Sequence, residues 1–188
     1  MRLAIFGGTF DPIHNAHLAI ARRAADDFRL DCVLLVPAAH PPHKAGVTYA
    51  PYEHRVHMAE IACAGDPRIA VSRIEENTER SYSIDTIEKL RPQLAKDDEL
   101  FFIIGADAFA EIRTWHRWLD VARAVRFLVV SRPGFDYEIP PEVQAERPTN
   151  LNLPVSSSEV RRELSAGQHP SEVPPVVLRY ILDRGLYR

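Results

Sequence analysis

Residues 7–17 read GGTFDPIHNAH, and they directly follow the apolar run Leu3-Ala4-Ile5-Phe6. An apolar run that ends in two glycines predicts a strand and a tight turn, where a ligand can come close because glycine has no Cβ. His14 and His17 stand three apart where a helix should begin, so they share one face. The first N–H groups of a helix have no helical partner and attract anions. The stretch therefore predicts a site for a phosphate chain, with both imidazoles donating to it and offsetting its charge.

The rest of the chain alternates short apolar runs with helical patterns. The apolar runs cover residues 3–6, 32–36, 69–74, 100–104 and 127–130, and the helical patterns cover residues 15–28, 51–64, 83–96 and 108–124, the last broken near Trp115. Nearly continuous apolar runs are typical of strands buried on both faces of a parallel sheet. The alternation predicts a Rossmann-like α/β fold, in which a doubly wound, mainly parallel sheet is flanked by helices. Ligands of such sheets bind beyond the carboxyl ends of the strands, so the loops after the first, second and fourth strands should carry the chemistry.

The C-terminal third holds no further obvious strand. Residues 133–152 are rich in proline and charge and predict a loop, whereas residues 157–166 and 174–184 predict two terminal helices packed on the main sheet. The 188 residues suffice for one good core, and no internal repeat or convincing linker divides them. We therefore expect residues 1–188 to form a single domain.

Composition excludes several classes of function. The net charge of −3 gives no bulk basic field, which predicts no nucleic-acid partner and no anionic membrane surface. No stretch approaches the roughly 20 apolar residues of a membrane span, and the N-terminus predicts a first strand rather than a signal peptide. Cys32 and Cys63 are expected to be small buried residues, so a reducing, cytoplasmic location is the expectation. Whether the chain forms a homo-oligomer is not encoded in a recognisable pattern.

Three loop segments carry groups that suit a nucleotide, although each also has an ordinary structural role. Lys44 ends the loop PAAHPPHK and either reaches an anion in the crevice or is a solvated loop lysine. Ser83 in RSYSIDT is a candidate N-cap, whose helix start also suits a carboxylate or a phosphate. Asp107 follows Gly105-Ala106 and either accepts hydrogen bonds from ribose hydroxyls or caps the next helix.

Aromatic and hydroxyl-rich segments complete the set. Both tryptophans lie in the segment TWHRW, where Trp118 is expected in the core and Trp115 is the better platform for a flat cationic ring. The segment VSSSEVRR opens a helix, and its serine hydroxyls with Arg161 can cradle a triphosphate or serve as a cap and surface charge.

Together these segments resemble one enzyme family over nearly the whole chain. GGTFDPIHNAH resembles the (T/H)xGH signature of the nucleotidyltransferases, with Ala16 in place of the signature glycine, and VSSSEVR resembles their second motif, ISxTxxR, with Val155 and Ser158 as mild substitutions. The segments PPHK, SYSIDT, FIIGAD and TWHRW stand in the order and spacing of the bacterial nicotinate-nucleotide adenylyltransferases, as does the ending around Tyr187.

The resemblance implies the transfer of AMP from ATP to nicotinate mononucleotide, giving nicotinate adenine dinucleotide and pyrophosphate. It implies Mg²⁺ as cofactor, carried by the ATP phosphates rather than by a dedicated protein site. The catalytic residues it implies are His14, His17 and Arg161. The ATP-binding residues it implies are Gly7, Gly8, Thr9, Phe10, Ser156, Ser158 and Arg161. The residues it implies for nicotinate mononucleotide are Lys44, Tyr82, Ser83, Ile84, Asp107 and Trp115, with the backbone around Ser83 and Ile84 meeting the carboxylate.

Three other interpretations remain at this point. The chain could be a phosphopantetheine adenylyltransferase or a cytidylyltransferase of the same superfamily, although a pantetheine arm offers no flat cation for Trp115 to stack on. It could bind a metal through the pairs His14/His17, His40/His43 and His54/His57, although no cysteine or acidic residue completes a set. It could also be a nucleotide-binding module without catalysis, although both signature histidines are present.

Overall fold

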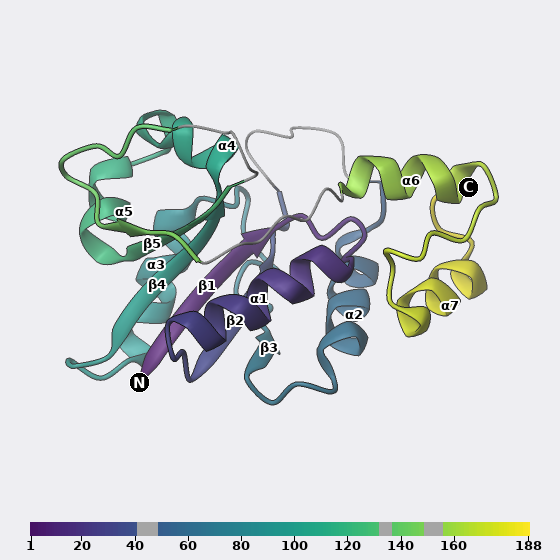
Figure 1. Cartoon of the computed structure of the whole chain (residues 1–188), viewed down its shortest axis with the longest axis horizontal. Helices are drawn as coiled ribbons and strands as arrows, with labels where there is room; N and C mark the ends of the chain where they lie inside the picture. Colours follow the sequence, from purple (N-terminus) through teal and green to yellow (C-terminus); the bar gives the residue numbers. More distant parts are fainter. Residues whose placement is uncertain (41–48, 132–136, 149–155) are drawn as a thin grey trace.

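The centre of the fold is a six-stranded sheet in which every neighbouring pair is parallel, seen across the middle of Figure 1. The computed structural model describes residues 1–40, 49–131, 137–148 and 156–188. The strand order is β3-β2-β1-β4-β5-β6. The strands are β1 (Arg2–Gly8), β2 (Cys32–Pro37), β3 (Ile69–Val71), β4 (Glu99–Gly105), β5 (Arg126–Val130) and β6 (Ala145–Glu146). Because the order reverses direction at β1, a crevice opens between the ends of β1 and β4.

Helices cover both faces of this sheet. One side is formed by α1 (Asn15–Asp27), α2 (Tyr52–Cys63), α6 (Ser157–Ser165) and α7 (Pro175–Arg184). The other side is formed by α3 (Ser83–Leu90), η2 (Arg91–Gln93), α4 (Ala106–Ala110), η3 (Ile112–Thr114) and α5 (Trp118–Ala124). Figure 1 shows α6 and α7 beyond α2 at one end of the molecule, where their apolar residues join the same core cluster as α1. The doubly wound α/β fold predicted from the sequence is confirmed.

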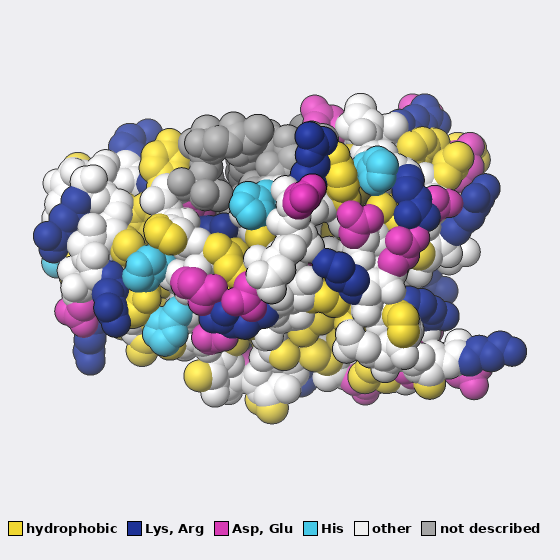
Figure 2. All heavy atoms as spheres, turned by 180° about the vertical axis from the view of Figure 1, so that it is seen from behind, with side chains coloured by type: hydrophobic (Ala, Val, Ile, Leu, Met, Phe, Trp, Pro, Cys, Tyr) yellow, Lys and Arg dark blue, Asp and Glu magenta, His cyan; other side chains and the backbone are white. Residues whose placement is uncertain are grey.

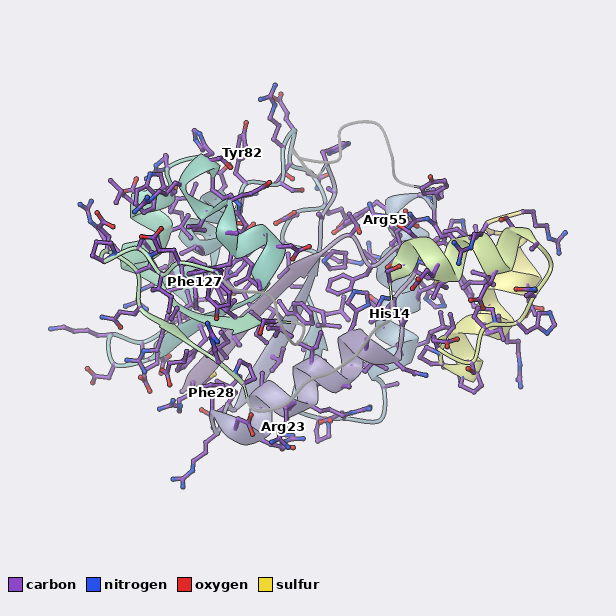
Figure 3. All side chains as sticks on the ribbon, turned by 45° about the horizontal axis from the view of Figure 1, so that its top comes forward. His14, Arg23, Phe28, Arg55, Tyr82 and Phe127 are labelled. Carbon is purple, nitrogen blue, oxygen red and sulfur yellow. The ribbon has the colours of Figure 1, made fainter. Side chains whose placement is uncertain are left out.

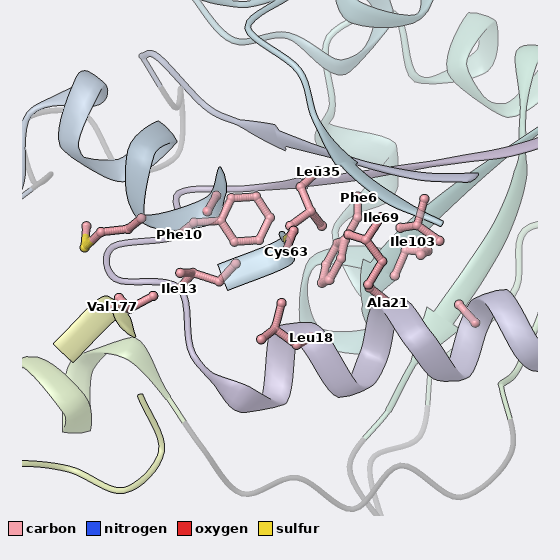
Figure 4. Close-up of a cluster of buried hydrophobic side chains, with 14 of the residues drawn as sticks. Phe6, Phe10, Ile13, Leu18, Ala21, Leu35, Cys63, Ile69, Ile103 and Val177 are labelled. Carbon is pink, nitrogen blue, oxygen red and sulfur yellow. The ribbon is translucent and has the colours of Figure 1, made fainter. Parts of the chain in front are cut away.

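Successive strand residues alternate between two cores. Ala4 and Phe6 pack under α1 and α2, as Figure 4 shows for Phe6, whereas Leu3 and Ile5 pack against the helices of the opposite face. Burial on both faces leaves no polar position in the strand, which is why the sequence shows a continuous apolar run instead of an alternating one.

Several boundaries differ from the sequence expectations. The helix expected over residues 83–96 ends at Leu90 and gives way to the 3-10 turn η2, which contains Pro92 and so lacks one backbone donor. The pattern at 108–124 is divided into α4, η3 and α5, and Arg117 before α5 adopts φ 52°. β3 has three residues rather than six, and the expected loop at 133–152 contains the two-residue strand β6.

The outer surface fits the composition. Figure 2 shows basic and acidic side chains interspersed on the face that it presents. None of the helices formed by the described residues is long and apolar enough to cross a membrane.

Candidate functional site

A cavity of about 250 Å³ lies at the carboxyl ends of β1 and β4. Its walls include Gly7, Gly8, Thr9, Ala38, Ser83, Gly105 and Trp115. The loops after the first, second and fourth strands all contribute to it, as the fold class predicts. The cavity therefore brings together residues that are far apart in the sequence. Gly7, Gly8 and Thr9 come from the segment GGTFDPIHNAH, Ser83 comes from SYSIDT, and Trp115 comes from TWHRW.

The turn after β1 is held by a buried aromatic ring. Phe10 is 1% exposed and adopts φ 47°, and its ring packs edge-on against Phe6 and His17 with centroids 5.7 and 5.0 Å apart. Figure 4 shows Phe10 inside the apolar layer beside Ile13. A Cβ added to Gly8 would come within 3.1 Å of this ring. Only the backbone of Phe10 is therefore left to face a nucleotide.

His14 and His17 form a stacked pair at the start of α1. His14 is the N-cap and His17 lies in the first turn, so their rings stack with centroids 3.7 Å apart and planes 21° apart. The backbone N–H of His14 donates to Nδ1 of His17 at 3.2 Å. Because Nδ1 of His17 accepts this bond, its hydrogen is carried by Nε2. His17 therefore presents a donor nitrogen on the side away from the helix cap.

His14 is neutral in this environment. The residue is 4% exposed, and its Nδ1 has no hydrogen-bond partner (Figure 3 labels the residue). Burial lowers the pKa of His14 from 6.5 to about 4. The expectation that this imidazole supplies positive charge is therefore wrong for the protein without a ligand, whereas a role as a neutral hydrogen-bonding group fits.

The second motif approaches the first through its helix start. Ser156 caps α6 by accepting from the N–H of Glu159 at 3.2 Å, and the hydroxyl of Ser157 donates to the Pro12 carbonyl at 3.3 Å. Arg161 donates to the Asp11 carbonyl at 2.7 Å. It also donates to the Ser158 hydroxyl at 3.2 Å and lies 4.2 Å over the Tyr49 ring. Among the described residues Arg161 has no carboxylate partner, so its charge is available to an anion.

Two buried charged residues that sequence reasoning missed hold the motif loops together. Arg55, 1% exposed, donates from Nε to the Ala50 carbonyl at 3.1 Å, and from Nη1 to the carbonyls of Thr9 and Ala38 at 2.7 and 2.8 Å. The residue is labelled on α2 in Figure 3. Arg55 thus ties the ends of β1 and β2 to α2.

Asp11 is the second of these residues. Its carboxylate accepts from the N–H groups of Tyr49 and Ala50 at 2.7 and 3.1 Å and from the hydroxyl of Tyr187 at 2.6 Å. Burial, together with the carboxylate of Asp11, raises the pKa of Tyr187. The only sequence signal for these contacts was the ending around Tyr187, which entered as part of the resemblance and without a structural role.

The start of α3 forms another wall of the crevice. Tyr82, not Ser83, is the N-cap, so the cap prediction was wrong by one residue and Ser83 instead lines the cavity. Ile84 is 2% exposed, which leaves its backbone as the part that a ligand can meet. The ring of Tyr82 stacks on His116 with centroids 4.4 Å apart, and neither residue lines the cavity.

The end of β4 carries the remaining predicted groups. Trp115 is half-buried, lines the cavity and packs edge-on against Phe102 at 5.9 Å. Asp107 is exposed in the first turn of α4, whose N-cap is Gly105, so the capping alternative for Asp107 is wrong. A Cβ on Gly105 would lie 2.6 Å from the Asp107 carboxylate, which folds back over this glycine. Lys44 lies outside the described residues.

The described residues contain no group of three or more His, Cys, Asp or Glu side chains that could hold a metal ion. His54 instead bonds Tyr180 through Nδ1 at 2.7 Å, and His57 lies 3.7 Å from Glu60.

Comparison with known proteins gives one consistent picture. The cytidylyltransferase-like family model matches residues 5–163. A probable nicotinate-nucleotide adenylyltransferase of Solibacter usitatus is 67% identical over 187 residues, covering all of both chains, and one of Thermus thermophilus is 43% identical over 194 residues, again covering both. The structure of Plasmodium falciparum nicotinic acid mononucleotide adenylyltransferase complexed with NaAD superposes with a TM-score of 0.79 over 99% of this chain and 97% of that one, at 20% identity.

Proposed function

The chain belongs to the nicotinate-nucleotide adenylyltransferase family, and from this premise we propose how its residues divide the work of the reaction. The enzyme transfers AMP from ATP to nicotinate mononucleotide, giving nicotinate adenine dinucleotide and pyrophosphate. The observation that supports the assignment of roles is the crevice between β1 and β4, whose walls include both the glycine turn after β1 and Trp115.

The nucleophile in this reaction needs little help to react. The acceptor is a phosphate monoester, whose second pKa is about 6, so it is mostly dianionic at neutral pH. It therefore requires neither a general base nor a covalent enzyme intermediate. The barrier comes from bringing two anions together and from the charge that develops on pyrophosphate, so positioning and aimed donors supply most of the catalysis.

On the ATP side, the backbone of Gly7, Gly8, Thr9 and Phe10 lines the nucleotide, while Ser156 and Ser158 face the triphosphate. Nε2–H of His17 and the ring of His14 donate to its oxygens as neutral groups. Arg161 supplies the fixed positive charge. Its guanidinium is oriented by the main-chain carbonyl of Asp11 and the hydroxyl of Ser158, which are uncharged groups and leave its charge unneutralised. These donors stabilise the leaving pyrophosphate more than the bound ATP, which is the condition for catalysis.

On the acceptor side, Trp115 stacks on the pyridinium ring, Tyr82 flanks the entrance, and Asp107 accepts from a ribose hydroxyl. Lys44 holds the acceptor phosphate. The N–H groups of Ser83 and Ile84 at the start of α3 donate to the nicotinate carboxylate. Those donors suit an acid better than an amide, because an amide NH₂ leaves a donor facing a donor, which costs about 1–3 kcal/mol.

An ATP-dependent nucleotidyltransferase suggests a divalent metal ion, and we propose Mg²⁺. When bound to ATP it neutralises phosphate charge while keeping much of its water shell. We also propose that residues 1–188 act as one cytoplasmic domain whose required partners are ATP and nicotinate mononucleotide.

The direct test is an assay of purified protein with ATP, Mg²⁺ and nicotinate mononucleotide, with the dinucleotide and pyrophosphate both quantified. We expect stoichiometric products, faster turnover of the acid than of nicotinamide mononucleotide, and no product when CTP replaces ATP. His17→Ala should lower kcat by about 10²–10³-fold, the usual cost of one transition-state donor, with an unchanged circular dichroism spectrum. Equal turnover with CTP, or an amide preference, would contradict the assignment.

A further inference from the structure

One buried carboxylate in the cavity wall has an oxygen without a partner. Glu75 is 6% exposed and lines the cavity that Trp115 also lines. Its Oε1 accepts from the Thr86 hydroxyl at 2.5 Å, whereas its Oε2 is buried and has no hydrogen-bond partner. Buried carboxylates are normally paired, because an isolated buried charge is strongly unfavourable.

No cation of the described protein compensates this group. Glu75 is the only ionisable side chain among the described residues that line the cavity, and none of their ion pairs includes it. The neighbouring Glu76 is different: it is exposed and lies 3.1 Å from Arg73. The rest of the cavity wall is largely apolar or backbone, so the field of Glu75 is weakly screened there.

We propose that Glu75 is the counter-ion of the pyridinium ring of the acceptor nucleotide. This inference rests on the proposed function, which places that ring against Trp115. The ring carries a fixed positive charge, so a carboxylate in the same wall attracts it while the indole face stacks on it. Thr86 fixes Oε1, which leaves Oε2 for the ring.

The test compares Glu75→Gln with Glu76→Gln, which removes the same charge one residue away on the surface. The readout is the calorimetric Kd for nicotinate mononucleotide, with KM values for both substrates measured alongside. We expect Glu75→Gln to weaken the mononucleotide about 10-fold, to weaken nicotinamide mononucleotide equally because its ring has the same charge, and to leave the KM for ATP unchanged. Glu76→Gln should change none of these.

A ligand with an uncharged ring distinguishes the effect of ring charge on the Kd from the effect of ring shape. Reduced nicotinate mononucleotide keeps the ribose, the phosphate and the carboxylate but has a neutral dihydropyridine ring, so its Kd should be the same for wild type and Glu75→Gln. If Glu75→Gln fails to fold, the wild type still tests the proposal, because equal affinity for the cationic and the reduced mononucleotide would contradict it.

Three results would overturn the proposal: an unchanged or lower Kd in Glu75→Gln, an equal loss for the reduced nucleotide, or equal wild-type affinity for both ring forms. Because these are binding measurements, they are distinct from a failure of the proposed function, which would appear as absent dinucleotide in the wild-type assay.

Discussion

Replacing Arg55 with methionine should destabilise the protein far more than replacing a surface arginine that has three carboxylate neighbours. Arg55 is 1% exposed and donates to three main-chain carbonyls, those of Thr9, Ala38 and Ala50. Each buried carbonyl left unpaired costs about 1–3 kcal/mol, and such losses are not additive, so we expect about 3–5 kcal/mol in the free energy of unfolding. Since Thr9 and Ala38 line the cavity, the KM for ATP should rise as well.

The measurement is urea unfolding at pH 7. With an m-value of about 2 kcal/mol/M, the midpoint should fall by about 2 M. Arg55→Lys keeps the charge, but one ammonium nitrogen cannot occupy both the Nε and the Nη1 positions from which Arg55 reaches the three carbonyls, so it should lose about half as much. The control is Arg73→Met: Arg73 lies near the carboxylates of Glu53, Glu60 and Glu76 but is exposed, so its midpoint should stay close to wild type.

A loss under 1 kcal/mol for Arg55→Met, or equal losses at the two arginines, would refute this reasoning. The first result would mean that water or a shifted backbone satisfies the three carbonyls. The second would mean that surface ion pairs matter as much as buried donors.

Three further predictions follow from the contacts of the first motif. The pKa of His14 is lowered from 6.5 in the unfolded chain to about 4, so the unfolded state binds the proton first as the pH falls. The free energy of unfolding should therefore decrease by about 3 kcal/mol between pH 6.5 and pH 4, and urea titrations of His14→Gln should lack this decrease. Tyr187→Phe removes the 2.6 Å bond to the Asp11 carboxylate and should lower the free energy of unfolding by about 1.5–3 kcal/mol. Gly8→Ala places a methyl group 3.1 Å from the buried Phe10 ring and should cost about 1–3 kcal/mol and much of the activity.

Each of these has an outcome that contradicts it. Identical pH dependence of the wild type and His14→Gln would show that the buried ring does not carry the shift. An unchanged midpoint in Tyr187→Phe would show that the two N–H donors suffice for Asp11. Gly7→Ala is the control for Gly8, because its added Cβ meets only an ordinary 3.7 Å contact with Phe102 and should leave folding intact.

The sequence predicted those structural elements that depend on residues adjacent to one another along the chain. The runs that became β1, β2, β4 and β5 were recognisable because burial on both faces leaves continuous apolar stretches. β6 has only two residues, and its segment is joined to β5 through the backbone, as in the bond from Phe127 N–H to the Gln144 carbonyl. Main-chain pairing of this kind needs no particular side chain, so the sequence of residues 145–146 contains no pattern that predicts a strand.

The site divides in the same way. His14 and His17 are three residues apart, so their meeting could be predicted from helical spacing. Asp11 and Tyr187 are separated by 176 positions. Arg55 binds carbonyls, which every residue possesses, and an arginine among the apolar residues of a helix is usually an ordinary surface residue. Such partners can be found only when the fold places them together.

The dimensions of the outermost strands have a consequence for the behaviour of the protein at high concentration. β3 has three residues and β6 has two, so each border of the sheet presents few unpaired backbone groups. A second molecule that tried to extend the sheet would gain only a few hydrogen bonds, too few to offset the ordering of its own chain. The long hydrophobic strands that could template aggregation are all internal, each flanked by a strand on both sides.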